Sequence, residues 1–169
     1  SASIRAKGVL QPLIVRPARR DGTYEMVAGE RRWRAAQMAQ VHELPVISRD
    51  LDDTEVLEIA IIENIQREDL NAIEEAMGFR QLMDRFGHTQ ERMAEALSKS
   101  RSHIANLLRL LTLPDAVQDM VRLGELSAGH ARALITSPNP LELARLVVER
   151  RLSVRETEKL AQSVQPNRE

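Results

Sequence analysis

The chain has 169 residues, of which 43% are hydrophobic and 29% charged, and its formal net charge is −1. This length allows one compact domain or two small ones, and the composition is that of an ordinary globular protein. Disulfides and thiolate metal sites are excluded because there is no cysteine, and no apolar run approaches the roughly 20 residues of a membrane-spanning helix or forms a signal peptide, so we expect a cytoplasmic protein.

The first 70 residues alternate between short apolar stretches and turn signals, a pattern that predicts a small mixed α/β unit. Gly8 is typical of a residue that ends a helix, Asp21-Gly22 is typical of a hairpin turn, and Gly29 precedes a helical stretch. The expected elements are a helix over 1–7, strands over 13–16, 24–28 and 43–48, and a helix over 30–39.

After residue 53 the apolar residues recur at helical spacing to the end of the chain. Two pairs, Asn71 with Glu74 and Ser153 with Glu156, have the spacing of a capping box at a helix start. The fold class predicted is therefore α+β, with the small α/β unit over 1–70 followed by an all-helical domain over 71–164 and the start of a linker over 165–169. The helices are expected near 56–64, 71–86, 89–97, 100–111, 114–124, 127–134, 141–150 and 153–164.

Three arginines, Arg31, Arg32 and Arg34, cluster at the start of the helix that follows Gly29. Cations at a helix N-terminus are disfavoured by about 0.3–1 kcal/mol each, whereas phosphate is favoured there and arginine offers forked donors that match its oxygens. One interpretation is therefore a phosphate site. The other is ion pairing with residues 41–84, which hold twelve acidic against three basic side chains.

A second polar cluster, Glu63, Asn64, Gln66 and Arg67, follows an apolar helical stretch. Carboxylate and amide oxygens suit Mg²⁺ that bridges substrate phosphates, and a carboxylate beside such a metal can orient or deprotonate water. An ordinary polar helix end is the alternative. The four histidines are scattered without the spacing of metal ligands, so no zinc site is expected.

Residues 89–108 have the layout of a helix-turn-helix. Ala94 is expected where the two helices cross, with Ile104 and Leu107 facing the first helix. Ser98 stands in the turn where glycine is frequent, and serine adopts the required left-handed backbone only at some cost. A pair of helices that serves only for packing is the alternative.

The second helix of such a motif places its first residues against base edges in the major groove of DNA. Arginine pairs with guanine, asparagine pairs with adenine, and serine or lysine holds phosphate. The residues expected to contact DNA are Thr89, Gln90, Lys99, Ser100, Arg101, Ser102, His103, Asn106 and Arg109.

Five short motifs occur in one order and spacing over nearly the whole chain. They are GVLQP at 8–12, AGERRWRA at 28–35, ENIQR at 63–67, KSRSH at 99–103 and GELSAGHAR at 124–132. In this combination the chain resembles the ParB family of chromosome-partitioning proteins.

The resemblance implies a DNA clamp that is switched by CTP and Mg²⁺. Family members bind and slowly hydrolyse CTP in the N-terminal unit, and they recognise a palindromic double-stranded site, parS, through the helix-turn-helix. Two N-terminal units then engage and close a clamp that slides on DNA. A ParA-type ATPase is the usual partner, the location is the bacterial nucleoid, and no membrane is involved.

The resemblance also assigns residues by motif. Glu63 and Asn64 are expected at the metal, and Glu30 and Glu63 are expected to support hydrolysis. The nucleotide-binding residues expected are Gly8, Gln11, Pro12, Gly29, Glu30, Arg31, Arg32, Glu63, Asn64 and Arg67.

Two further parts of the family are expected outside this chain: an upstream segment that contacts the ATPase, and a C-terminal dimerisation domain beyond the linker. Three other functions share some of these features. A nucleoid-occlusion-type or other site-specific DNA-binding adaptor has almost every motif, whereas a ParB-fold phosphotransferase that uses nucleotide has no need of a basic recognition helix. A purely structural helical protein leaves the arginine-rich helix start unexplained.

Overall fold

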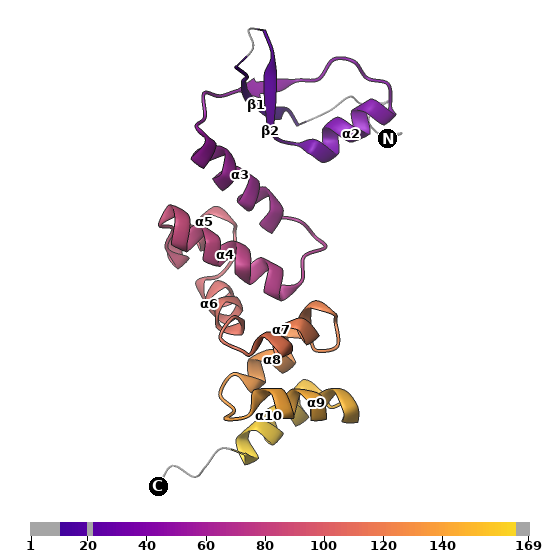
Figure 1. Ribbon diagram of the computed structural model, residues 1–169, viewed down its shortest axis with the longest axis vertical. Helices are drawn as coiled ribbons and strands as arrows, with labels where there is room; N and C mark the ends of the chain where they lie inside the picture. The colour runs from indigo at the N-terminus through magenta and orange to yellow at the C-terminus, as the bar shows by residue number, and fades with distance from the viewer. Residues whose placement is uncertain (1–10, 20–21, 165–169) are drawn as a thin grey trace. The chain divides into compact units, whose positions relative to one another are not determined.

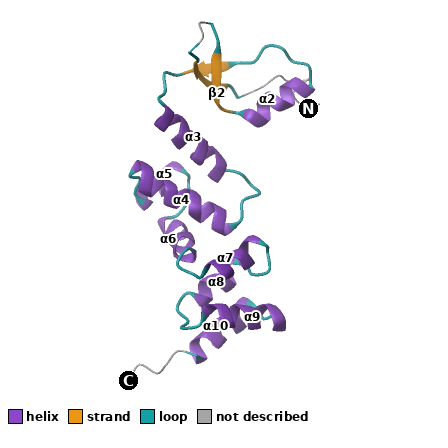
Figure 2. Ribbon diagram, viewed as in Figure 1, coloured by secondary structure: helices purple, strands orange, loops and turns teal. Residues whose placement is uncertain are grey.

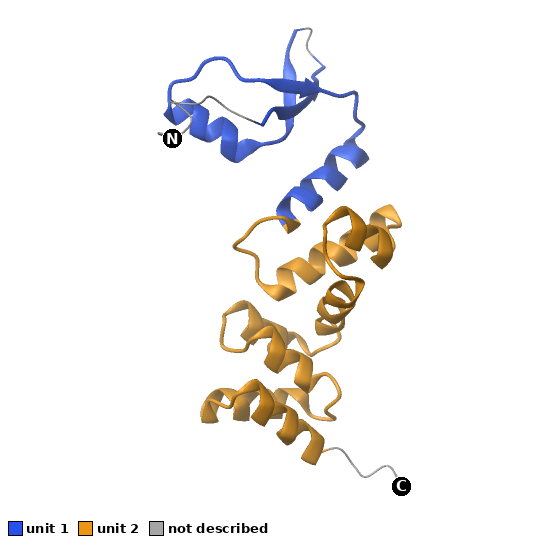
Figure 3. Cartoon of the chain, turned by 180° about the vertical axis from the view of Figure 1, so that it is seen from behind, with its two compact units in different colours: residues 1–64 blue, residues 65–169 orange. Residues whose placement is uncertain are grey.

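The computed structural model describes residues 11–19 and 22–164 of the chain. The chain divides into two compact units, residues 1–64 and residues 65–169 (Figure 3). The observed division therefore falls six residues before the expected one at residue 70. The expected helix over 1–7, Gly8 and the expected linker over 165–169 lie outside the described residues.

Unit 1 is built on a three-stranded sheet in the order β2-β1-β3 (Figures 1 and 2). Strand β1 pairs antiparallel with β2 and parallel with β3, and helix α2 packs against β1. The core consists of aliphatic side chains, among them Leu13, Val15, Val27 and Ala36 from the strands and α2. The elements are β1 (Leu13–Pro17), β2 (Tyr24–Ala28), α2 (Glu30–Met38), β3 (Val46–Ser48) and α3 (Asp53–Ile65).

Strand β3 is shorter than the predicted strand over 43–48. It begins at Val46, directly after Pro45, and the Pro45 carbonyl accepts a 3.0 Å hydrogen bond from the Leu13 amide. Proline has no N–H with which to continue the ladder, so regular pairing starts only after it.

Arg16 fixes the point at which the chain leaves the sheet for α3. Its guanidinium lies 2.8 Å from Glu25 on β2 and 2.8 Å from Asp53 at the start of α3, and it donates a 3.2 Å hydrogen bond to the Leu51 carbonyl. These acids raise the pKa of Arg16, chiefly through the hydrogen bond to Glu25. One side chain of β1 therefore connects β2, the connecting loop and α3.

Unit 2 is entirely helical in its described part. The helix starts follow the sequence pattern closely: Asn71 and Ser153 form the two predicted capping boxes, and Thr89 and Ser100 each accept a hydrogen bond from the first turn. The elements are α4 (Ala72–Phe86), α5 (Gln90–Ala96), α6 (Arg101–Leu110), α7 (Asp115–Arg122), α8 (Ala128–Leu134), α9 (Pro140–Arg150) and α10 (Val154–Ser163).

Helix α6 lies in the core of this unit and packs against α4, α5 and α8. Its side chains Ile104 and Leu110 are fully buried, as is Phe79 of α4, the largest buried side chain. Burying a side chain of this size is worth roughly 1.5–3 kcal/mol. The α+β fold class predicted from the sequence is confirmed, and no described helix combines the length and apolar character needed to cross a bilayer.

The turn between α5 and α6 uses serine in a left-handed conformation, as predicted. Ser98 has φ +53°. Its amide donates a hydrogen bond to the Glu95 carbonyl, and the amide of the following Lys99 donates one to the Ala94 carbonyl. This is the hydrogen-bond pattern of a Schellman motif, in which glycine usually holds the left-handed position.

We therefore predict that Ser98→Gly stabilises the chain. A non-glycine residue in the left-handed region costs roughly 1–2 kcal/mol, and part of this gain is lost to the greater entropy of unfolded glycine, so the net gain should be about 0.5–1 kcal/mol. Urea unfolding followed by circular dichroism measures it. Ser102→Gly, on the exposed face of α6, is the matched control and should destabilise by about 0.5 kcal/mol. A loss of stability in both variants would contradict the prediction.

Candidate functional site

Helix α2 starts at a glycine that no other residue replaces easily. Gly29 has φ +107°, and a Cβ placed on it would lie 2.5 Å from Cδ2 of Leu13. A side chain is therefore excluded both by the backbone conformation and by the close approach of β1. Because Gly29 has no side chain, the amides of the first turn receive no side-chain cap. Such amides, together with the helix dipole, favour an anion.

Arg32 ties this helix start to the residues that precede β1. Its Nη1 donates hydrogen bonds to the carbonyls of Gln11, at 3.2 Å, and Pro12, at 2.9 Å. The structure thus brings together Gln11, Pro12, Gly29 and Arg32, four of the expected nucleotide-binding residues. These contacts are to backbone oxygens rather than to the acidic residues of 41–84.

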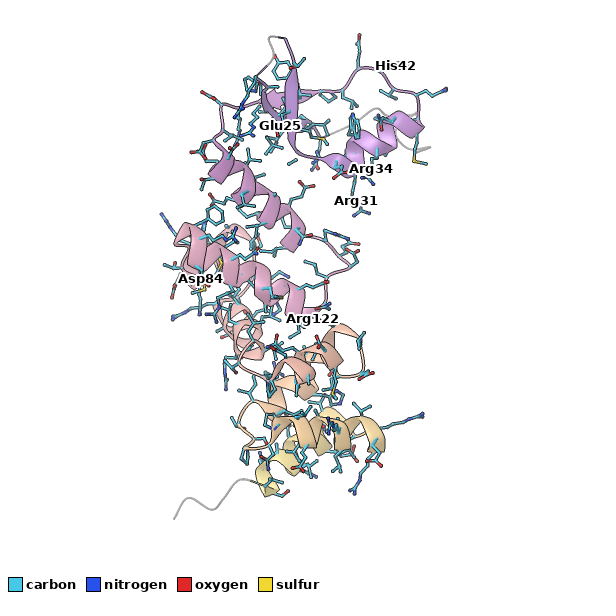
Figure 4. The ribbon with its side chains drawn as sticks, viewed as in Figure 1. Glu25, Arg31, Arg34, His42, Asp84 and Arg122 are labelled. Carbon is cyan, nitrogen blue, oxygen red and sulfur yellow. The ribbon has the colours of Figure 1, made fainter. Side chains whose placement is uncertain are left out.

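The two neighbouring arginines behave differently from Arg32. Arg34 pairs with Glu30 one turn earlier on α2, with both side chains more than half exposed. Arg31 is exposed, and Figure 4 shows it extending outward from α2; within the described residues it has no ion-pair partner. At the helix start, Arg32 thus bonds backbone carbonyls and Arg34 forms a surface ion pair. Arg31 is available to a ligand.

The second predicted cluster lies at the end of α3 and just beyond it. Glu63 is half-buried and Asn64 is exposed on the last turn of α3, whereas Arg67 belongs to unit 2 and bonds Asp69 through Nε at 3.1 Å and Nη2 at 2.7 Å. The hydrogen bond that Arg67 donates to Asp69 is the main reason that the pKa of Arg67 is raised.

One carboxylate and one amide do not form a complete metal cage. Among the described residues there is no group of three or more His, Asp or Glu side chains placed to hold a metal ion. Oxygen donors of this number and kind do fit Mg²⁺, which is commonly held by one or two protein oxygens together with waters and substrate phosphates.

The helix-turn-helix of α5 and α6 exposes most of the predicted DNA-contacting residues. The apolar face of α6 is buried through Ile104 and Leu107, as the sequence predicted, so the opposite face of the helix is turned outward. Arg101, Ser102 and Arg109 are exposed, and Asn106 is half-buried. Of the nine predicted residues, all but Gln90 and Asn106 are exposed.

Two of these residues also have a structural task. Thr89 Oγ1 accepts a 3.2 Å hydrogen bond from the Arg92 amide, and Ser100 Oγ accepts a 3.0 Å hydrogen bond from the His103 amide. In both cases the hydroxyl acts as an acceptor. Its own hydrogen remains a donor, which is the group that a phosphate oxygen requires.

The sequence did not single out the acids that contact this surface. Arg101 pairs with Glu91 of α5 at 2.9 Å, and both Lys99 and His103 approach Glu75 of α4. A signal for Glu75 was present: α4 starts with two consecutive glutamates, and the capping box accounts only for Glu74. That signal gives no hint of the partners, because they lie more than twenty residues away.

Comparison with protein families finds two matches that together cover nearly the whole chain. The family described as the ParB N-terminal domain matches residues 1–65, and the family described as the ParB HTH domain matches residues 68–166.

Two curated relatives illustrate the similarity. The chromosome-partitioning protein ParB of Caulobacter vibrioides strain NA1000 is 56% identical over 168 residues, which cover 99% of this chain and 55% of the relative. The ParB of Myxococcus xanthus is 51% identical over 166 residues, which cover 96% of this chain and 55% of the relative. The chain thus spans about half the length of the curated relatives it matches.

Solved structures show the same similarity. C-terminally truncated ParB from Caulobacter crescentus complexed to the centromeric parS site has a TM-score of 0.86 at 52% identity, covering 95% of this chain and 86% of that one. A ParB DNA-binding domain complexed to parS has a TM-score of 0.59 at 53% identity, covering 68% of this chain and 94% of that one. The Caulobacter protein complexed with CTP-gamma-S has a TM-score of 0.42 at 55% identity, covering 86% and 82%.

We predict that Gly29→Ala destabilises unit 1 by about 2–5 kcal/mol, the sum of the left-handed backbone cost and of overpacking against Leu13. Urea unfolding followed by the fluorescence of Trp33, the only tryptophan, measures it. Gly22→Ala is the matched control, because Gly22 has φ +77° but no atom near its Cβ position. It should cost only about 1–2 kcal/mol. Equal losses in the two variants would show that the contact with Leu13 is unimportant.

Proposed function

The chain belongs to the ParB family, and we propose that it is a chromosome-partitioning protein that binds a palindromic parS duplex through α5 and α6 and binds CTP with Mg²⁺ through unit 1. The observation that carries the proposal is the helix-turn-helix whose second helix exposes a basic and polar face. That face is the part of the chain best suited to a DNA major groove.

The DNA half of the proposal is supported by the side chains that α6 exposes. Arg101 stands at the first residue of the helix, where a recognition helix meets base edges, and its pairing with Glu91 is a surface contact worth at most about 1 kcal/mol. DNA therefore displaces Glu91 at little cost. Ser100 and Thr89 keep a hydroxyl donor for phosphate while capping their helices. Two solved ParB structures similar to this chain are complexes with the parS site, which supports the proposal that this unit binds DNA.

The nucleotide half is supported by the start of α2. Its uncapped amides and the outward Arg31 suit a phosphate group, and Arg32 holds Gln11 and Pro12 beside them. Under this proposal Glu63 and Asn64 hold Mg²⁺, which would neutralise part of the triphosphate charge. The resemblance to the family adds Gly8 and Arg67 to the residues proposed to contact the nucleotide.

The resemblance to the family extends the proposal to the cycle of the whole protein. Under it, Glu30 and Glu63 support slow hydrolysis of bound CTP, and two N-terminal units engage to close a clamp on DNA. The protein works in the cytoplasm on the nucleoid, with a ParA-type ATPase as partner.

Calorimetric titration tests both halves in one series. The chain is titrated with CTP, ATP and GTP in the presence of Mg²⁺, with and without a parS duplex, and separately with parS and a scrambled duplex. We expect selective binding of CTP and of parS. Preference for parS without binding of any nucleotide would contradict the nucleotide half and favour a site-specific DNA-binding adaptor. Equal binding of both duplexes would contradict the DNA half.

For the nucleotide we predict that Arg31→Ala weakens CTP binding by roughly ten- to hundredfold, because one charged hydrogen bond is worth about 1.5–3 kcal/mol. Arg34→Ala is the matched control: it removes the same charge from the same helix, but from a side chain already paired with Glu30. Its CTP affinity should change by less than about threefold, and parS binding should be unchanged in both variants. A comparable loss of CTP affinity in the two variants would show that only the net charge of α2 matters.

For DNA we predict that Arg101→Ala reduces parS affinity by about 1–3 kcal/mol while CTP binding is unchanged. Fluorescence anisotropy with parS and scrambled duplexes measures the loss and shows whether the preference for parS falls with it. The control is Arg122→Ala on α7, whose guanidinium pairs with Asp119. If parS affinity falls equally in both variants, Arg101 acts only through the overall charge.

A further inference from the structure

Glu75 is a largely buried acid beside the surface that we assign to DNA. It lies in the first turn of α4, and only 16% of its side chain is exposed. Its Oε1 atom is fully buried and receives no hydrogen bond from the described residues. The Lys99 ammonium lies 3.3 Å from this oxygen and His103 Nε2 lies 3.5 Å from it, so both contacts are electrostatic rather than aligned hydrogen bonds.

The two partners of Glu75 come from the turn and from the recognition helix. Lys99 follows the left-handed Ser98, and His103 is the third residue of α6. Their side chains are 40% and 44% exposed, so each has one part against the carboxylate and another part in solvent. A single carboxylate on α4 therefore contacts two of the predicted DNA-contacting side chains.

The position of this acid is unfavourable for simple attraction to DNA. A lysine near DNA attracts phosphate whatever the sequence, and each such contact makes log K fall more steeply with log salt by about 0.9. A lysine that already faces a buried carboxylate contributes less of this attraction. The neighbouring Glu74 differs from Glu75 because it is exposed. Its carboxylate closes the capping box by accepting a hydrogen bond from the Asn71 amide.

Resting on the proposed DNA-binding function, we propose that Glu75 is a positioning residue that sets DNA specificity. Its carboxylate holds Lys99 and His103 at the start of α6 and prevents Lys99 from adding a phosphate contact on duplexes of any sequence. Glu75 thereby lowers non-specific binding more than binding to the specific site.

The test measures the affinity of the whole chain for parS and scrambled duplexes between 50 and 200 mM salt. In Glu75→Gln, the slope of log K against log salt for the scrambled duplex should steepen by up to about 0.9, which is roughly a three- to fourfold extra loss of affinity over this range. The preference for parS should fall by a similar factor at low salt. A slope and a preference equal to those of the unchanged chain would overturn the proposal.

The matched control is Glu74→Gln. It removes the same charge from the same turn, and glutamine still supports a capping box. If both variants change the slope equally, Glu75 acts only through net charge and the proposal is wrong. Lower stability with an unchanged slope would likewise reduce Glu75 to a packing role.

The double variant Glu75→Gln/Lys99→Gln tests whether Glu75 acts through Lys99. Both partners are neutral in it, so its non-specific slope should return to that of the unchanged chain even if Glu75→Gln alone folds poorly. A shallower slope than that of the unchanged chain would show that Lys99 contacts phosphate despite Glu75. If the unchanged chain shows no preference for parS, the proposed function is contradicted. If it prefers parS but Glu75→Gln has no effect, only the inference about Glu75 is contradicted.

Discussion

Burial of the apolar face of α6 is the constraint on which the helical unit depends. Ile104 and Leu107 enter the core formed with α4, α5 and α8, so the rotation of α6 about its axis is fixed. The opposite face of the helix must then face solvent, and it carries the exposed residues Arg101, Ser102 and Arg109. Hydrophobic packing of one face of α6 thus exposes the side chains that we assign to base recognition on the other face. The capped turn at Ser98 and Ser100 sets where that helix begins.

Arginine and glycine have structural roles in unit 1 beside its aliphatic core. Arg16 and Arg32 connect the elements of this unit through acids and backbone carbonyls. Gly29 allows β1 and α2 to approach closely, and the same glycine leaves the helix start without a side-chain cap. Close packing of α2 on β1 and a helix start without a side-chain cap therefore have one common cause.

Two acidic residues contact the surface that we propose to bind DNA. Glu91 and Glu75 each contact a basic residue of the turn or of α6, but their environments differ: the first pair is largely exposed and the second carboxylate is mostly buried. An exposed pair is readily exchanged for DNA, whereas a buried carboxylate keeps its partners in place. Under our proposals, such a surface favours selective over maximal attraction to phosphate.

Local chemistry in the sequence determined where the elements begin and end. Asn71 and Ser153 cap helices through neighbours three residues away, Ser98 takes the left-handed turn, and apolar spacing identifies the buried face of α6. The third strand is shorter than predicted because Pro45 has no N–H to continue the ladder. The contacts of Arg32 with Gln11 and Pro12, and of Glu75 with Lys99 and His103, were decided only by the tertiary structure. They join residues about twenty or more positions apart, and spacing along a chain carries no information about which distant charges folding brings together.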